Sequence, residues 1–207
     1  MGPSVPLSTL RRAYELALFV LFLAAFARSR RTRGTAVTVR ELAFGFAVSQ
    51  TVELLAVALG RYRYPDWLVY FPPRPALVPL AIGLGWAALL PGVMRASEML
   101  LGRRAAIARL AALDGALAVA LDLVLDPIVS GAPMRMWLWR GDGMTPYRLW
   151  LLGVPVFNFV GWFVLVFACS LELRFVAARP SARAWPYLSL FFVADLVIAR
   201  ALMLLPW

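Results

Sequence analysis

The sequence predicts an all-α protein: a polytopic integral membrane bundle of about six transmembrane helices, in one domain that covers residues 1–207. Hydrophobic residues make up 62% of the chain and charged residues only 15%, whereas soluble domains are nearer half apolar and a quarter charged. Six segments also reach or approach the roughly 20 apolar residues that a helix needs to cross a bilayer. The sequence contains no visible internal repeat and no separate soluble segment.

The expected helices follow the apolar segments in order, and arginines or turn-forming residues separate them. The first spans residues 13–27 and ends at a segment, 28–40, that carries five arginines. Residues 25–27 resemble a signal-peptide cleavage site, but arginines directly after such a site oppose export, so we expect this helix to be retained. The remaining five expected helices span residues 41–60, 76–94, 110–129, 149–171 and 185–205.

All 21 basic residues are arginines, and the net charge is +10. The arginines lie mostly between apolar segments, which is typical of a membrane protein, so we do not expect nucleic acid as a partner. Segments 28–40, 95–109 and 174–184 carry twelve arginines, whereas the alternate connections and the N-terminal tail carry eight. The positive-inside rule therefore favours the first set as cytoplasmic.

Histidine is absent, and Cys169 is the only cysteine. An intrachain disulfide is therefore impossible, and the commonest general base and metal ligand is missing. Acid–base chemistry in this chain has to use carboxyl groups, tyrosine or water.

Several acidic residues fall inside or near the expected helices, where they are costly and mark functional sites by default. They are Glu15, Glu53, Asp114, Asp122, Asp126 and Asp195. Arg200 is the one basic residue deep in an expected helix, and its simplest role is to pair with an acid of a neighbouring helix. One arginine cannot neutralise six carboxylates, so we expect some of them to be protonated or hydrated, and a buried protonated carboxyl is a ready general acid.

Asp122 and Asp126 are four residues apart and therefore share one face of a helix. Counting 1.5 Å per residue from the helix ends puts Glu53, Trp86, Asp122 and Asn158 at similar depths in the bilayer. The sequence gives depth but not the rotation of one helix against another, so convergence into one pocket and scattering around the bundle both stay open. The Asp-x-x-x-Asp spacing also matches the Mg²⁺ and diphosphate motif of membrane prenyltransferases, although the second acidic motif that they need is missing.

Four pieces of sequence between about residues 50 and 165 carry a resemblance. They are Glu53 with Gly60, Tyr62 and Tyr64; Val78-Pro79 with Trp86; Asp122, Asp126 and Pro127 with Trp137 and Trp139; and Gly153-Val154-Pro155 with Asn158-Phe159-Val160-Gly161-Trp162. Together they resemble the bacterial carotenoid 1,2-hydratases, a membrane family that includes bisanhydrobacterioruberin hydratase and γ-carotene 1′,2′-hydratase.

This resemblance implies a carotenoid biosynthesis enzyme that adds water to the terminal 1,2 double bond of an acyclic ψ-end. A proton must reach C2, and water must then capture the tertiary cation at C1. The resemblance further implies that no redox or metal cofactor is required, that the carotenoid is bound within the bilayer, and that the protein lies in the bacterial inner membrane. It also allows association with other enzymes of the carotenoid pathway.

We expect Asp122, Asp126 and Glu53 to be the catalytic residues. Asp122 is the predicted proton donor ahead of Glu53, because it lies one turn deeper than Asp126 and should be harder to ionise, whereas Asp126 precedes Pro127 near the membrane face and should orient the attacking water. Glu53 is expected to hold the pocket together through hydrogen bonds to Tyr64 or Asn158. The predicted substrate-binding residues are Tyr62, Tyr64, Trp86, Asn158 and Trp162.

Other interpretations stay open. A non-catalytic carotenoid-binding subunit would use the same pocket without chemistry, and a small transporter would use the acids as a proton relay, although transporters often show internal repeats. Tryptophans near the ends of the expected helices are typical of anchors at the membrane interface. We expect this role for Trp67, Trp137, Trp139 and Trp185.

Overall fold

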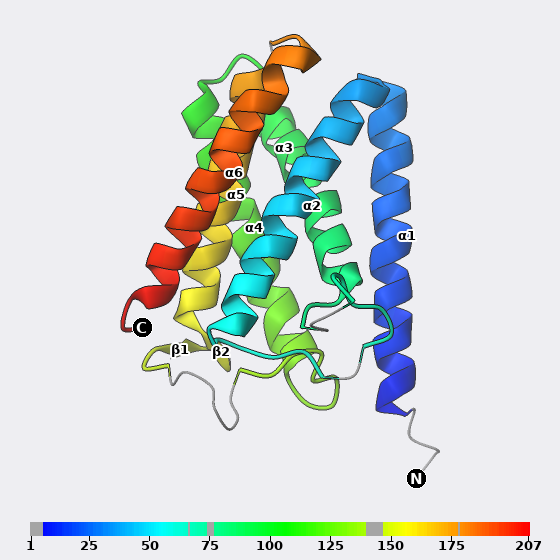
Figure 1. Cartoon of the computed structure of the whole chain (residues 1–207), viewed down its shortest axis with the longest axis vertical. Coiled ribbons are helices and arrows are strands. Elements are labelled where there is room, and N and C mark those ends of the chain that lie inside the picture. The colour runs from blue at the N-terminus through cyan, green and yellow to red at the C-terminus, as the bar shows by residue number, and fades with distance from the viewer. Residues whose placement is uncertain (1–5, 66, 74–76, 140–146, 178) are drawn as a thin grey trace.

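Six helices run up and down the computed structural model and pack side by side (Figure 1). The structure describes residues 6–65, 67–73, 77–139, 147–177 and 179–207. The helices are α1 (Leu7–Arg33), α2 (Thr35–Ala58), α3 (Leu80–Leu101), α4 (Ile107–Ser130), α5 (Val156–Ala177) and α6 (Ser181–Leu204). A short antiparallel hairpin of β1 (Trp150–Leu151) and β2 (Val154–Pro155) leads into α5.

Helix α3 has the most central position, with α1, α2 and α4 packed against it. Helix α5 packs between α4 and α6, and α6 returns to α2, so that α1 lies at the edge of the bundle. Short turns join the helices at one end. The described parts of the two long connections, residues 59–65, 67–73 and 77–79 and residues 131–139 and 147–155, lie together at the other end, next to the C-terminus (Figure 1).

The predicted all-α bundle of six helices is confirmed. Four of these helices, α2, α3, α5 and α6, are long and apolar enough to cross a membrane by length and composition. Helix α4 carries three aspartates, and arginines crowd both ends of α1. These charges explain why hydropathy alone does not mark α1 and α4 as spans.

The helices at the arginine-rich end are longer than the sequence suggested. The predicted loop 28–40 is almost wholly helical, because α1 continues to Arg33 and α2 begins at Thr35. Gly34 makes the reversal with a positive φ of 85°, a conformation that glycine adopts without steric cost. The Thr38 hydroxyl donates to Ser29 Oγ at 2.9 Å across the turn. Arginine has a high helix propensity, so a run of arginines does not end a helix.

The predicted starts of the third and fifth helices are wrong by four and seven residues. Helix α3 begins after Pro79, because residues 69–71 and 78–80 first pair through backbone hydrogen bonds. Helix α5 begins at Val156, because Leu152 and Gly153 both have positive φ and turn the chain into a hairpin. Two successive residues with positive φ form the tight turn that suits a two-residue hairpin.

Arg174 neutralises the buried Asp114 at the end with the short turns. Its guanidinium lies 2.9 Å from both Glu98 and Asp114, and it also donates to the Ser97 hydroxyl at 3.0 Å. The expected partner, Arg200, is instead exposed on α6 and forms no ion pair with any acid that the structure describes. Pairing with Arg200 was therefore the wrong expectation, because the side chain faces away from the bundle.

We expect Arg174→Leu to lower the free energy of unfolding by about 3–5 kcal/mol, because it leaves the buried Asp114 carboxylate without its cation. Thermal unfolding in detergent, followed by circular dichroism, measures the effect. Arg103→Ala is the matched control: the Arg103 side chain is 73% exposed beside Glu98, and its loss should change stability by at most about 1 kcal/mol. Equal melting temperatures for the two variants would contradict this account.

Candidate functional site

Glu53 is the centre of a hydrogen-bond cluster on α2. Its Oε2 accepts hydrogen bonds from the hydroxyl groups of Tyr62 and Tyr64, the latter at 2.6 Å, and its Oε1 accepts from Trp86 Nε1 at 3.3 Å. Burial, together with the Glu53 carboxylate, raises the pKa of Tyr62 and of Tyr64 well above the ordinary value, so both hydroxyls keep their protons. Glu53 therefore receives three hydrogen bonds and is held in one orientation.

Asp122 and Asp126 form a second polar cluster one helical turn apart on α4. Both are almost completely buried, at 0% and 1% exposure. The amide Nδ2 of Asn158 on α5 donates to Oδ2 of Asp122 at 2.7 Å and to Oδ2 of Asp126 at 2.6 Å. Within the described part of the chain, no arginine forms an ion pair with either carboxyl group, and the second oxygen of each has no hydrogen-bond partner.

One cavity of about 140 Å³ brings these two clusters together, between α1, α2, α3, α4 and α5. Seven of the eight residues predicted as a site line it: Glu53, Tyr62, Tyr64, Trp86, Asp126, Asn158 and Trp162. The eighth, Asp122, is joined to the cavity wall through Asn158. Residues that the sequence placed at similar depths on separate helices therefore lie close together in space, a point that the sequence left open.

A second cavity lies on the other side of the same wall, between α2, α5 and α6. It shares Glu53, Tyr62, Trp86, Asn158 and Trp162 with the first cavity. The rings of Trp86 and Trp162 pack at a centroid distance of 4.2 Å and an angle of 34°. These two indoles therefore form an aromatic partition between the two cavities, directly beside Glu53.

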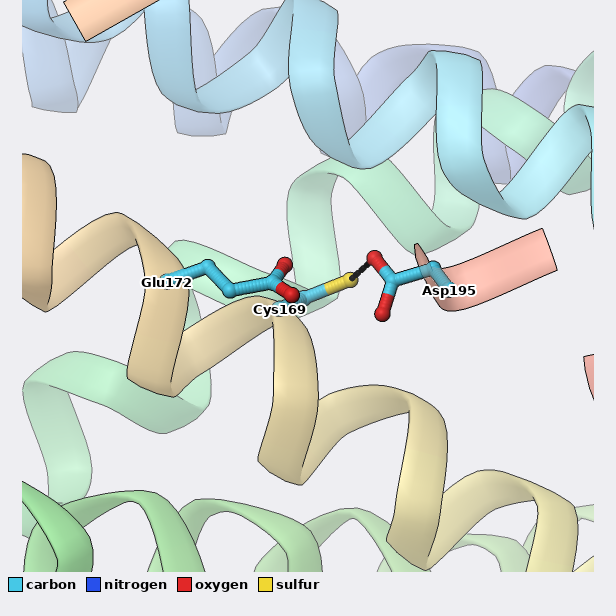
Figure 2. A group of neighbouring side chains, drawn as sticks. All are labelled: Cys169, Glu172 and Asp195. Atoms are coloured by element: carbon cyan, nitrogen blue, oxygen red, sulfur yellow. Dashed lines mark hydrogen bonds between the residues drawn. The ribbon is translucent and has the colours of Figure 1, made fainter. Parts of the chain in front are cut away.

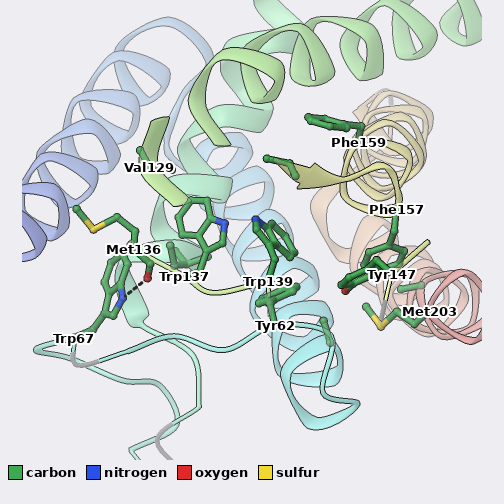
Figure 3. Close-up of a cluster of buried hydrophobic side chains, with 14 of the residues drawn as sticks. Tyr62, Trp67, Val129, Met136, Trp137, Trp139, Tyr147, Phe157, Phe159 and Met203 are labelled. Carbon is green, nitrogen blue, oxygen red and sulfur yellow. Dashed lines mark hydrogen bonds between the residues drawn. The ribbon is translucent and has the colours of Figure 1, made fainter. Parts of the chain in front are cut away.

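The interfacial role predicted for Trp67, Trp137 and Trp139 is wrong, since all three are buried. The two long connections pair through backbone hydrogen bonds between Arg63 and Leu138 and fold inward, as Figure 3 shows for the buried indoles. Trp67 Nε1 donates to the backbone oxygen of Met136 at 2.9 Å. Trp185, by contrast, is exposed, as an interfacial residue would be.

Trp137, Trp139 and Tyr14 are cavity-lining residues that the site prediction missed. Trp139 packs edge-on against Tyr62 with 5.0 Å between the ring centroids, and Trp137 packs edge-on against Tyr64 with 6.2 Å between the ring centroids. Trp137 and Trp139 belong to the same motif as Asp126, and this motif was the feature of the sequence that could have identified them as site residues. Tyr14 lies on α1, and neither its spacing nor its surroundings in the sequence indicated which face of the bundle it would meet.

Glu15 has a structural role on α1. Its carboxylate accepts the backbone N–H of Leu68 at 3.1 Å and that of Val69 at 3.3 Å. These contacts attach the first long connection to α1, next to the cavity. Together with the pairing of Asp114 by Arg174, they account for two of the six acidic residues that the sequence singled out.

Chemically, the site offers a buried pair of carboxyl groups, a rigid carboxylate and a set of indole and phenol faces around an apolar space. Comparison with known protein families identifies a family. A family model described as carotenoid biosynthesis protein covers residues 13–205. No curated protein matches the chain, and no solved structure does.

Proposed function

Because the chain belongs to the family of carotenoid biosynthesis proteins, we propose that it is a hydratase that adds water to the 1,2 double bond of an acyclic carotenoid ψ-end. The observation that carries this proposal is the cavity between α1, α2, α3, α4 and α5, which joins the Asp122–Asp126 pair to the cluster around Glu53. In the proposal the protein works in the bacterial cell membrane, and its substrate stays in the bilayer.

The proposed reaction begins with proton transfer from the carboxyl group of Asp122 to C2. The π electrons form the new C2–H bond, and a tertiary cation develops at C1. Water then attacks C1 and loses a proton to Asp126. Transfer of that proton between the two neighbouring carboxyl groups restores Asp122. Atoms and charges balance without an oxidant or reductant.

Two features of the site support these roles. A pair of buried carboxyl groups that lacks a cation among the described residues favours a state that holds one proton, because two adjacent buried anions would repel each other. The indole faces of Trp86 and Trp162 border the same cavity, and such faces stabilise a desolvated cation by about 0.5–2 kcal/mol each.

Glu53 fits a supporting role better than that of proton donor. Its two oxygens accept hydrogen bonds from Tyr62, Tyr64 and Trp86, an arrangement suited to an ionised carboxylate. A fixed negative charge beside the cavity would also favour the developing cation. Asp122 therefore remains the preferred donor in this proposal, and Glu53 holds the aromatic wall.

The substrate would enter from the lipid. Leu21 on α1 and Leu121 on α4 both line the cavity, yet they are 52% and 45% exposed on the outer surface of the bundle. The cavity thus reaches an apolar part of the outer surface between these two helices. An acyclic polyene dissolved in the bilayer would insert its end here without passing through water.

Expression in a bacterial host that accumulates an acyclic ψ-end carotenoid tests the proposal. We expect the host to form a product heavier by one water that carries a tertiary hydroxyl at C1, as measured by liquid chromatography and mass spectrometry. A vector without the gene is the control. Unchanged carotenoid that co-purifies with the protein would instead indicate a non-catalytic carrier. If the host forms no hydrated product and no carotenoid binds to the protein, both the hydratase and the carrier are rejected.

A further inference from the structure

A second group of buried acidic side chains lies away from the Asp122–Asp126 pair, between α5 and α6 (Figure 2). Cys169 and Glu172 are three residues apart on α5 and share one face of that helix, and Asp195 faces them from α6. One ligand atom from each of the three lies within 4.8 Å of the other two. The Cys169 thiol is 3.7 Å from Oδ2 of Asp195.

These groups are buried without charge compensation. The exposed fractions are 4% for Cys169, 8% for Glu172 and 2% for Asp195. Among the residues that the structure describes, no arginine forms an ion pair with either carboxylate. Oε2 of Glu172 and Oδ1 of Asp195 also lack any hydrogen-bond partner there. The contrast with Asp114, which has Arg174, shows that this bundle does supply a cation to a buried acid elsewhere.

The donor set has the chemistry of a transition-metal site. Mg²⁺ and Ca²⁺ prefer oxygen ligands and bind a thiolate poorly. Zn²⁺ binds sulfur and carboxylate oxygen together in tetrahedral geometry. Ligands about 2.0–2.3 Å from a tetrahedral zinc lie roughly 3.5 Å from one another. The Cys169–Asp195 separation of 3.7 Å is close to this value.

We propose that Cys169, Glu172 and Asp195 form a zinc site that joins α5 to α6. Asp195 also lines the cavity between α2, α5 and α6, so the fourth position opens toward that cavity and takes a water molecule. Three protein ligands and one water make a four-coordinate site. This site goes beyond the proposed hydration, which uses Asp122 and Asp126 on the other side of the Trp86–Trp162 partition.

Metal content of the purified protein tests the proposal. The protein should be prepared without a polyhistidine tag and analysed by inductively coupled plasma mass spectrometry. We expect about one zinc per chain. Treatment with a strong chelator should remove the zinc and lower the melting temperature, and added Zn²⁺ should restore the original melting temperature. Replacement by Co²⁺ should give a sulfur-to-cobalt charge-transfer absorption in the near ultraviolet.

Variants assign the ligands. Cys169→Ser should abolish the charge-transfer absorption, and Asp195→Asn or Glu172→Gln should remove most of the bound zinc. Asp126→Asn, which changes the other acidic pair, should keep it. Wild-type protein without stoichiometric zinc, without the cobalt absorption and with an unchanged melting temperature under chelation would overturn the proposal and leave a proton-sharing cluster. Because these readouts do not use hydration, their failure is distinguishable from failure of the proposed function.

Discussion

Asp122→Asn should lower the rate of hydration by about 10²–10⁴-fold, the usual contribution of a general acid, and leave the fold intact. The asparagine keeps the volume of Asp122, and its carbonyl oxygen can accept the same hydrogen bond from Asn158 that now measures 2.7 Å. Only the transferable proton is removed. Hydrated product per unit of membrane protein, measured in the carotenoid-accumulating host, gives the rate.

Asp114→Asn is the matched control for this change. Asp114 lies on the same helix and is equally buried, but it binds Arg174, whereas Asp122 is joined to the cavity wall through Asn158. We expect this control to lose stability while its folded fraction hydrates at the normal rate. If Asp122→Asn accumulates to normal levels and hydrates as fast as the wild type, Asp122 is not the donor. If Glu53→Gln alone abolishes hydration, the donor role moves to Glu53.

Asn158→Leu should lower the hydration rate by roughly 10–100-fold and also reduce stability. Leucine has a similar volume, but it cannot donate the hydrogen bonds of 2.7 Å and 2.6 Å that hold the two carboxyl groups. A hydrogen bond to a charged group contributes about 1.5–3 kcal/mol, and about 1.4 kcal/mol corresponds to a tenfold change in rate. Product analysis and a thermal melt of each purified variant provide the two readouts.

Asn158→Ser gives a graded control, because one hydroxyl can donate to only one of the two carboxyl groups. Its rate should fall between those of Asn158→Leu and the wild type. A wild-type rate in Asn158→Leu would mean that the amide does not position the pair. In that case Asn158 would keep only the substrate contact that the sequence suggested.

Depth within the membrane was the part of the site that the sequence could supply. Rise per residue placed Glu53, Trp86, Asp122 and Asn158 in one layer. In the structure Glu53, Trp86 and Asn158 line one cavity, and Asp122 is joined to its wall through Asn158. The rotation of each helix was not accessible, because it depends on packing between segments far apart in the chain. For the same reason Tyr14 on α1 was missed as a cavity-lining residue.

The connections between helices were the least predictable part of the fold. Trp67, Trp137 and Trp139 looked like interfacial anchors because they lie near the ends of apolar segments. They are buried because the two long connections pair at Arg63 and Leu138 and fold over the cavity. Such pairing joins residues 75 positions apart, and no local pattern of hydropathy reports it.

The sequence predicted that an arginine would pair with a buried acid, but it did not identify which arginine. The sequence showed too few intramembrane cations for its acids. Among the residues that the structure describes, no arginine forms an ion pair with Asp122, Asp126 or Asp195. The sequence pointed to Arg200 because that residue lies within an apolar segment. Arg174, near the end of α5, reaches Asp114 and Glu98 instead, because a long arginine side chain can extend along a helix into the bundle.

The origin of the hydroxyl oxygen tests the central claim most directly. Membranes that contain the protein and an acyclic ψ-end carotenoid should be incubated in water enriched in heavy oxygen and, separately, in deuterium oxide. The account predicts one solvent oxygen at C1 and one solvent deuterium at C2, both lost in Asp122→Asn. A hydroxyl whose oxygen comes from molecular oxygen, or a product without deuterium at C2, would contradict hydration by carboxyl-group protonation.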